Sequence, residues 1–397
     1  MTSRYILFLL LGIDALILFF QISELSISYY EARILYGEFS FLQLITNFSL
    51  SIFGHNDLAL RLPMMLLHLS SVILLYLNSK KYLKYERDKI WLVLIFILLP
   101  GSISSALQIN SAGLLIFGLF LFVYIYENFN LKYIYILLPI YALIDGGFLY
   151  LFLSLIFYAY YIKDKIFFIV NLILFSISMY IYGLNAHGLP SGHLLDALAV
   201  YFAIFSPIVF IYLFYILYKK LYTKKVDLVW FISFLPLIFS LLLSLRQRVE
   251  LDEFAPYIML ALLLGAEIFT QSYRVRLKVF RKKYKIMFII SLVFLLFNSL
   301  IVLFNKELYK VIENPKKHFA YKMYIAKELS IKLKELNISC IDSNDDLSYR
   351  LKFYGITQCD RYILNEESLS TKNKVDVTIS YKNIVVYKAN VTKINNE

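Results

Sequence analysis

The fold of this protein is decided by stretches such as residues 286–304, which read IMFIISLVFLLFNSLIVLF and contain no charged side chain. At about 1.5 Å of rise per residue, such a stretch forms a helix that crosses about 30 Å of hydrocarbon. Comparable runs recur over the first 304 residues, and 60% of the 397 residues are hydrophobic while 17% are charged. The runs are continuous rather than alternating. They predict an all-α polytopic membrane bundle and exclude a soluble enzyme, a secreted disulfide scaffold and a disordered chain.

We predict about eleven transmembrane helices from these runs. Their expected ranges are 5–22, 58–78, 90–107, 111–127, 133–145, 147–162, 166–183, 197–218, 226–244, 255–273 and 286–304. Two of them are short and meet at Asp145-Gly146-Gly147. This pair fits either a tight helical hairpin or a broken, re-entrant element.

The distribution of Lys and Arg predicts the orientation of the chain. Basic residues crowd loops such as 80–89, 219–225 and 274–285, whereas the alternate loops contain only Arg33, Arg246 and Arg248. The positive-inside rule therefore places the N-terminus in the cytoplasm and the C-terminus on the outer side of the membrane. Because the sequence looks bacterial, we expect the spans in the inner membrane and the C-terminus in the periplasm. We interpret the formal charge of +12 as orientation signals and contacts to membrane lipids, not as a nucleic-acid site.

The composition becomes polar after residue 304, so we divide the chain into a membrane domain, 1–304, and a small periplasmic α+β domain, 305–397. A helix is expected at 320–336, and short strands in NISCIDSNDD, VDVTISY and NIVVYKANV. Cys340 and Cys359 are either a disulfide or two buried thiols, and we favour the disulfide because the periplasm is oxidising. A loop of that size would stabilise the domain by about 3 kcal/mol.

Charged side chains gather in two of the predicted outer loops. The loop after the first span contains Glu24, Glu31, Arg33, Glu38, His55, Asp57 and Arg61, and the loop before the tenth span contains Arg246, Arg248, Glu250, Asp252 and Glu253. Guanidinium groups bind phosphate by paired hydrogen bonds, and a carboxylate accepts a proton or binds a metal ion. This pattern suits a reaction on a phosphate-bearing lipid. The alternative is a set of helix-end charges at the headgroup level.

The sequences of these loops resemble those of the membrane glycosyltransferases with the GT-C fold. It is most similar to the branch that contains the protein mannosyltransferases and the aminoarabinose transferases that modify lipid A. The similarity is carried by Glu31-Ala32-Arg33, Phe53-Gly54-His55-Asn56, Arg61-Leu62 and the segment SLRQRVELDEFAPY at 244–257. Two positions depart from that pattern. Tyr30 stands where an Asp is expected, and Asn110 stands where the second outer loop often carries an acid.

The resemblance implies an inverting transfer of a sugar from a polyprenyl-phosphate donor to a lipid, glycan or protein acceptor at the outer face. It suggests Glu31 as general base for a hydroxyl acceptor, and Arg246 and Arg248 as the groups that stabilise the donor phosphate. A lipid phosphate acceptor is already ionised and would need fewer carboxylates. Supporting roles are expected for Tyr30, Arg33, Asp57, Arg61, Asn110, Asp252 and Glu253. Arg33 either pairs with Glu31 or forms an ordinary helix-end ion pair.

A divalent metal is the one cofactor that the sequence suggests. Glu31, His55 and Asp57 could bind it together. The alternative, which we favour, is that Gly54-His55-Asn56-Asp57 forms a turn and a cap before the next helix.

Two other functions remain open from the sequence. A transporter or flippase of lipid-linked sugars would use intramembrane charges as a path, although the chain shows no internal repeat. A catalytically silent GT-C relative would explain Tyr30 and Asn110.

Overall fold

The computed structural model describes residues 3–183, 192–223, 226–365 and 374–393. Contacts divide the chain into two compact units. The first comprises Met1–Leu18 and Met64–Ser299, and the second comprises Phe19–Pro63 and Leu300–Glu397. We predicted a boundary at residue 304. The second unit includes the segment that follows this boundary together with the first predicted outer loop.

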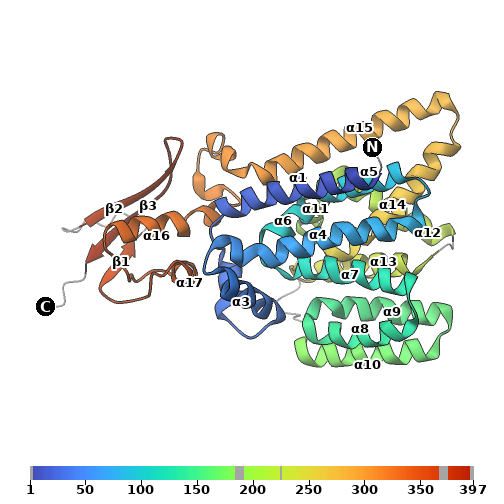
Figure 1. The fold of residues 1–397 in the computed structure, drawn as a ribbon, viewed down its shortest axis with the longest axis horizontal. Coiled ribbons are helices and arrows are strands. Elements are labelled where there is room, and N and C mark those ends of the chain that lie inside the picture. Colours follow the sequence, from blue (N-terminus) through green and yellow to red (C-terminus); the bar gives the residue numbers. More distant parts are fainter. Residues whose placement is uncertain (1–2, 184–191, 224–225, 366–373, 394–397) are drawn as a thin grey trace. The chain divides into compact units, whose positions relative to one another are not determined.

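Residues 3–303 form a series of helices (Figure 1). They are α1 (Ser3–Glu24), α2 (Tyr29–Tyr36), α3 (Phe41–Phe53), α4 (Asp57–Tyr82), α5 (Glu86–Ile97), α6 (Pro100–Leu107), α7 (Ser111–Asn128), α8 (Leu131–Ile144), η1 (Gly146–Phe148), α9 (Leu149–Ile162), α10 (Lys165–Tyr182), α11 (Leu194–Phe205), α12 (Pro207–Thr223), α13 (Leu228–Ser244), α14 (Ala255–Val275) and α15 (Lys278–Leu303). In the described part of the chain, six helices are long and apolar enough to cross a membrane: α1, α4, α7, α10, α14 and α15. The protein is therefore a multi-pass membrane protein with an all-α bundle.

Each of the eleven predicted spans falls on a helix or a helix pair, but not all are continuous. The expected span at 90–107 is the pair α5 and α6, bent by 60°, and the one at 197–218 is the pair α11 and α12, bent by 107°. The breaks precede Pro100 and Pro207, because proline donates no backbone N–H and disfavours a helical conformation in the residue before it. Counting each pair as one span gives up to eight spans among the described residues, and α8, α9 and α13 are shorter apolar helices.

Several helices begin where a short polar side chain accepts a hydrogen bond from the first turn. Asn110 accepts from the backbone of Gly113 at the start of α7, and Asp227 accepts from Trp230 at the start of α13. These caps satisfy backbone N–H groups that have no partner within the helix. Asn110 and Asp227 therefore help to fix where α7 and α13 start.

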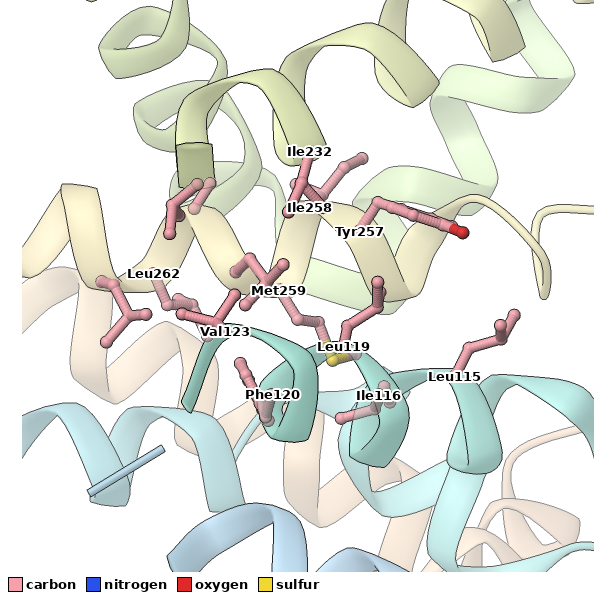
Figure 2. Packing of buried hydrophobic residues seen from close by; sticks show 14 of the residues in the cluster. Leu115, Ile116, Leu119, Phe120, Val123, Ile232, Tyr257, Ile258, Met259 and Leu262 are labelled. Carbon is pink, nitrogen blue, oxygen red and sulfur yellow. The ribbon is translucent and has the colours of Figure 1, made fainter. Parts of the chain in front are cut away.

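The core of the first unit lies where α7 packs against α14, which in turn packs against α13 (Figure 2). Leu115 and Leu119 of α7 and Ile258 of α14 are almost completely buried. Tyr257 of α14 is also buried, and its hydroxyl donates to the carbonyl of Gly147 across 2.6 Å. Packing and this hydrogen bond together hold the predicted DGG turn against α14.

A buried polar pair joins α1 to α4 within the first unit. Asp14 and His68 are both nearly inaccessible, and Asp14 Oδ2 lies 2.9 Å from His68 Nε2. The other ring nitrogen of His68 lies 3.4 Å from Ser102 Oγ. Ionisable groups inside a membrane helix are costly unless paired, which explains why the two side chains face each other.

The second unit contains the C-terminal α+β segment. Its elements are η2 (Asn305–Lys310), η3 (Pro315–Lys317), η4 (Tyr321–Tyr324), α16 (Ala326–Glu335), α17 (Asp345–Phe353), β1 (Tyr362–Asn365), β2 (Lys374–Tyr381) and β3 (Ile384–Lys393). The strands form an antiparallel sheet in the order β1-β3-β2, with Val377 opposite Ala389. Apolar side chains of α16, α17 and the sheet share a small core.

Most of the predictions for this segment are confirmed. Two of the three predicted strands are β2 and β3, which a turn at Lys382 and Asn383 joins with two positive φ angles of 45° and 72°. The predicted strand in NISCIDSNDD is wrong, since that stretch forms only isolated bridges through Cys340 and Asp342. Cys340 and Cys359 form the expected disulfide.

Candidate functional site

The predicted catalytic segment YYEAR forms the short helix α2, and its first turn is closed by Ser28 and Glu31. The Ser28 hydroxyl accepts a hydrogen bond from the backbone N–H of Glu31, and the backbone N–H of Ser28 donates to Glu31 Oε2 across 2.8 Å. This reciprocal arrangement is a capping box, which satisfies two backbone donors at once. Glu31 therefore sets where α2 begins.

The same carboxylate forms a buried ion pair with Arg61. Arg61 Nε lies 2.8 Å from Glu31 Oε1, and Nη2 lies 2.7 Å from Oε2, so the contact uses two parallel hydrogen bonds. Two further N–H groups of Arg61 donate to the carbonyls of Leu25 and Ser26 at 2.9 Å and 2.8 Å. Both charged groups are at most 1% exposed. A buried pair of this kind is tolerated only when its hydrogen-bonding groups are satisfied, as they are here.

Arg33, which we expected near Glu31, lies elsewhere. Its side chain is exposed, and Arg61 takes the place beside Glu31. Of the two alternatives for Arg33, the ion pair with Glu31 is therefore not the one that the structure forms. Arg33 lies in the last turn of α2, whereas Glu31 lies in the first.

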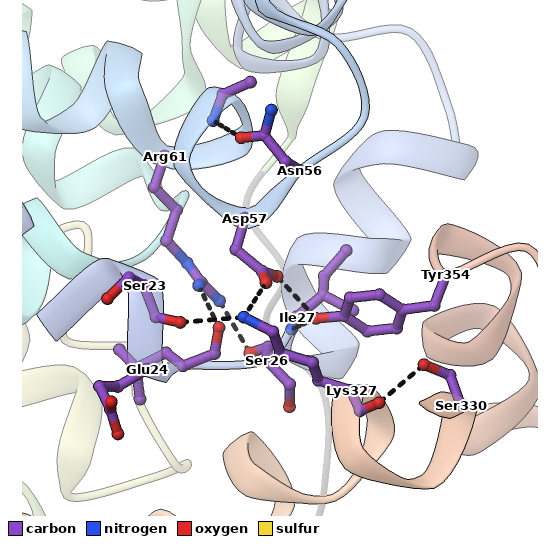
Figure 3. A network of polar contacts seen from close by, with 12 residues as sticks. Ser23, Glu24, Ser26, Ile27, Asn56, Asp57, Arg61, Lys327, Ser330 and Tyr354 are labelled. Atoms are coloured by element: carbon purple, nitrogen blue, oxygen red, sulfur yellow. Dashed lines mark hydrogen bonds and ion pairs between the residues drawn. The ribbon is translucent and has the colours of Figure 1, made fainter. Parts of the chain in front are cut away.

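Asp57, which is buried, belongs to a second, partly buried network, which Figure 3 shows. Tyr354 donates its hydroxyl hydrogen to Asp57 Oδ1 across 2.6 Å, and Lys327 Nζ lies 2.8 Å from Oδ2. The backbone N–H of Ile27 donates to the Tyr354 hydroxyl, and Lys327 also donates to the carbonyl of Ser23. Burial and the nearby Asp57 raise the pKa of Tyr354 well above its usual value, so the phenol stays protonated and remains a donor.

The suggested metal site is not formed by these residues. Glu31 and Asp57 each engage a cation, and His55 is exposed, with its ring 6.1 Å from that of Phe353. Within the part of the chain that the structure describes, no group of three or more His, Cys, Asp or Glu side chains is arranged to hold a metal ion. The stretch from Gly54 to Asp57 instead leads into α4, as the favoured alternative predicted.

A cleft of about 510 Å³ opens beside α2. Its lining residues are Tyr29, Tyr30, Arg33, Ile34, Gly37, Glu38, Ser40 and Tyr349. Tyr30, the residue in place of the expected Asp, is 74% exposed. The cleft combines phenol rings with one guanidinium group and one carboxylate. Such a lining can stack on a sugar ring, bind a phosphate and accept a proton.

The shape of the cleft depends on Gly37, which follows α2. Its backbone N–H donates to the carbonyl of Arg33 across 2.8 Å. A Cβ atom at this position would lie 2.4 Å from the Arg33 carbonyl oxygen, which is too close for any side chain. Glycine thus allows the chain to turn tightly after α2 and to place Glu38 at the cleft.

The other predicted site residues lie in the first unit. Arg246 and Arg248 are exposed and follow α13, and Asp252 and Glu253 precede α14. Their functional roles stay predictions. Asn110, as described above, is a helix cap.

A group of carboxylates lies among these loops. Burial raises the pKa of Glu253 to about 7, with nearby Asp145 and Glu250 adding to the effect and the Tyr150 hydroxyl opposing it. Asp145 accepts hydrogen bonds from Ser111 Oγ and from the backbone of Gly147, both at 2.8 Å. Glu253 can therefore gain or lose a proton near neutral pH.

The sequence placed Glu31, Arg61 and Asp57 in the same predicted outer loop. It did not predict the residues of the C-terminal segment that lie beside this loop. Tyr349, Tyr354 and Lys327 lie about 300 residues further along the chain. No local pattern could have indicated them, because their contacts arise only when the second unit folds. Arg246 and Arg248 belong to the first unit, so their predicted action together with Glu31 stays a prediction.

Comparison with known proteins shows the fold. No protein-family model matches the chain, and no curated protein sequence matches it. Among solved structures, the chain is similar to ArnT from Cupriavidus metallidurans in the apo state, with a TM-score of 0.59 over 98% of each chain and 10% sequence identity. The GT-C fold that the loops predicted is thereby confirmed.

Proposed function

We propose that this protein is a membrane glycosyltransferase that moves a sugar from a polyprenyl-phosphate donor to a lipid A, glycan or protein acceptor in the cell envelope. The observation that supports this most directly is the cleft beside α2. It is walled by a short helix of the first predicted outer loop and lined by Arg33, Glu38 and three tyrosines. The GT-C fold, shared with ArnT, supports the same reaction class.

The proposed orientation places this cleft on the periplasmic side of the bacterial inner membrane. The positive-inside rule supports it, because the loops that carry few Lys and Arg include residues 23–57. The disulfide Cys340–Cys359 supports it too, since disulfides persist in oxidising compartments. A polyprenyl-phosphate donor would present its sugar at that face.

The chemistry needs a group that stabilises the leaving phosphate. Arg246 and Arg248 stay our candidates from the late outer loop, and Arg33 joins them because it lines the cleft. A guanidinium group presents two parallel N–H donors to a phosphate, which suits the charge that develops as the sugar leaves.

Glu31 would act as a base only after releasing Arg61. Both of its carboxylate oxygens are engaged, and the side chain is completely buried. In the structure, Glu31 holds the loop in position and is not available as a base.

A catalytically silent GT-C relative is the second candidate. It is favoured by Tyr30, a phenol at the place of the expected acid, and by Asn110, whose side chain caps α7. Such a protein would keep the fold and the cleft and transfer no sugar.

Mass spectrometry of lipid A and surface glycans tests the proposal. Cells that lack the protein should lose one hexose, aminosugar or pentose from an envelope molecule, and the wild-type chain should restore it. The missing mass would identify both the sugar and the acceptor. Identical profiles with and without the protein would contradict a transferase and favour the silent relative.

A reporter enzyme fused after residue 304 tests the orientation separately. A reporter that works only in the periplasm should be active in this fusion, and one that works only in the cytoplasm should be inactive. The reverse result would contradict the proposed side of the membrane without bearing on the fold.

A further inference from the structure

The carboxylates of the first predicted outer loop differ sharply in their surroundings. Glu31 binds Arg61 with both oxygens, and Asp57 binds Tyr354 and Lys327 with one oxygen each. Both side chains are buried, at 0% and 6% exposure. A general base has to reach the proton that it removes, directly or through one water molecule. In the structure, the carboxylates of Glu31 and Asp57 cannot reach the proton of an acceptor.

Glu24 is also engaged, because it forms an ion pair with Lys306, and it does not line the cleft. Glu38 differs from these carboxylates in its exposure, its ion pairing and its position at the cleft. It is exposed, it lines the cleft, and no ion pair to it exists among the described residues. Its position follows from the turn at Gly37, where any side chain would collide with the Arg33 carbonyl. The fold thus presents one unengaged carboxylate of this loop to the cleft.

The cleft also contains the complementary cation. Arg33 lines it, and its exposed guanidinium has no ion pair within the described ranges. Tyr30 and Tyr349 contribute exposed phenol rings to the same lining. Aromatic faces pack against the C–H groups of a sugar, and a guanidinium group binds the adjoining phosphate. These groups together match a sugar joined to a phosphate.

We propose that Glu38 is the general base of the transfer, and that Arg33 binds the leaving phosphate in the same cleft. The inference rests on the proposed function and names its acceptor as a hydroxyl group. Glu31 and Arg61 then act as positioning residues that hold α2. Glu38 takes over the role that the sequence had suggested for Glu31.

The proposed step conserves atoms and charge. Glu38 accepts the proton of the acceptor hydroxyl while the acceptor oxygen forms a bond to the anomeric carbon of the donor sugar. The bond between that carbon and the phosphate oxygen breaks, and its electron pair stays on the phosphate. Arg33 stabilises the resulting charge, and the proton on Glu38 passes to water. The products are a glycoside and a polyprenyl phosphate.

The test compares Glu38→Gln with Glu313→Gln, a matched change at an exposed position outside the cleft. The full-length variants are produced in cells that lack the native protein, and sugar transfer is measured by mass spectrometry of the envelope. Loss of a general base typically lowers a rate by about 100-fold or more. Glu38→Gln should show this loss, while Glu313→Gln should transfer at the wild-type rate.

Binding separates a catalytic role from a structural one. Purified full-length protein in lipid nanodiscs is titrated with polyprenyl phosphate. Glu38→Gln should bind this probe like the wild type, and Arg33→Gln should bind it at least tenfold more weakly. Loss of folding would be visible as a lower melting temperature, and Glu38→Asp should restore part of the transfer.

The outcomes are distinct. Wild-type transfer by Glu38→Gln would overturn the inference and leave the proposed function intact. A well-folded Glu31→Gln variant that transfers no sugar, beside an active Glu38→Gln variant, would return the base to Glu31. If even the wild-type chain restores no sugar, the proposed function fails.

Discussion

Tyr354 donates a 2.6 Å hydrogen bond to Asp57, although 297 residues separate them in the sequence. The bond joins the segment after α17 to the first turn of α4 within the second unit. Lys327, in α16, pairs with the other oxygen of the same carboxylate. The first predicted outer loop and the C-terminal segment are therefore joined by partly buried polar contacts.

Removing the Tyr354 hydroxyl should destabilise the second unit. Tyr354→Phe leaves Asp57 with Lys327 but removes a hydrogen bond to a charged group, which is worth about 2 kcal/mol. It also leaves the Ile27 N–H without its acceptor. Thermal unfolding in detergent measures the effect.

Tyr349→Phe, at a half-exposed position of the same unit, is the control and should melt like the wild type. Equal melting temperatures for both variants would contradict the role given to this bond.

Glu31→Gln should be more damaging, because it leaves the Arg61 charge buried and unpaired. Breaking a buried pair on one side typically costs about 3–5 kcal/mol. Unfolding experiments should show this loss, and Glu313→Gln should not. A Glu31→Gln variant with wild-type stability would show that the ion pair does not hold the loop.

The membrane bundle was predictable because apolar periodicity is a local property. The polar residues that start helices, such as Asn110 and Asp227, are local as well. The spans at 90–107 and 197–218 were predicted as continuous because hydropathy alone does not register the breaks. Pro100 and Pro207 were the visible signals for them.

The candidate site was only partly predictable. The pattern Glu31-Ala32-Arg33 and Arg61 drew attention to the loop that walls the cleft, but residue types could not show which acid is buried. The Glu31 carboxylate takes part in a capping box and in an ion pair with Arg61, whereas Glu38 lines the cleft. Burial is decided by tertiary contacts, so the roles of chemically identical side chains cannot be read from their order in the sequence.

Stability should depend on pH through Glu253. Its pKa in the folded chain is raised from 4.5 to about 7, mainly by burial. Between these values the folded chain keeps the proton and the unfolded chain loses it, so the free energy of unfolding falls as the pH rises. Glu253→Gln cannot ionise and should flatten this slope. Melting temperatures recorded from pH 4.5 to pH 8 test it.

The control for this experiment is Glu335→Gln, an exposed carboxylate of the second unit, which should keep the wild-type slope. Parallel curves for the wild type and Glu253→Gln would contradict the assignment of the pH dependence to this group.

The disulfide should contribute strongly to the small C-terminal fold. Cys340 and Cys359 are 19 residues apart, and closing a loop of this size stabilises a protein by about 3 kcal/mol. Cys340→Ala with Cys359→Ala should therefore lower the melting temperature. A reductant should lower that of the wild type by a similar amount and leave the double variant unchanged. A reductant that affects both proteins equally would contradict this explanation.

Substitutions of Asp14 and His68 should have non-additive effects on the free energy of unfolding. Their side chains meet at 2.9 Å between α1 and α4, so either Asp14→Ala or His68→Ala leaves the other buried polar group without this partner. The double variant should be less destabilised than the sum of the two single variants. Residues in direct contact show coupling energies of about 0.5–3 kcal/mol. Unfolding of the four proteins in one detergent gives this energy. The cycle of Ser291→Ala, at a partly exposed position of α15, with His68→Ala is the control and should be additive. Additive effects for Asp14 and His68 would show that their contact contributes nothing beyond the two separate side chains.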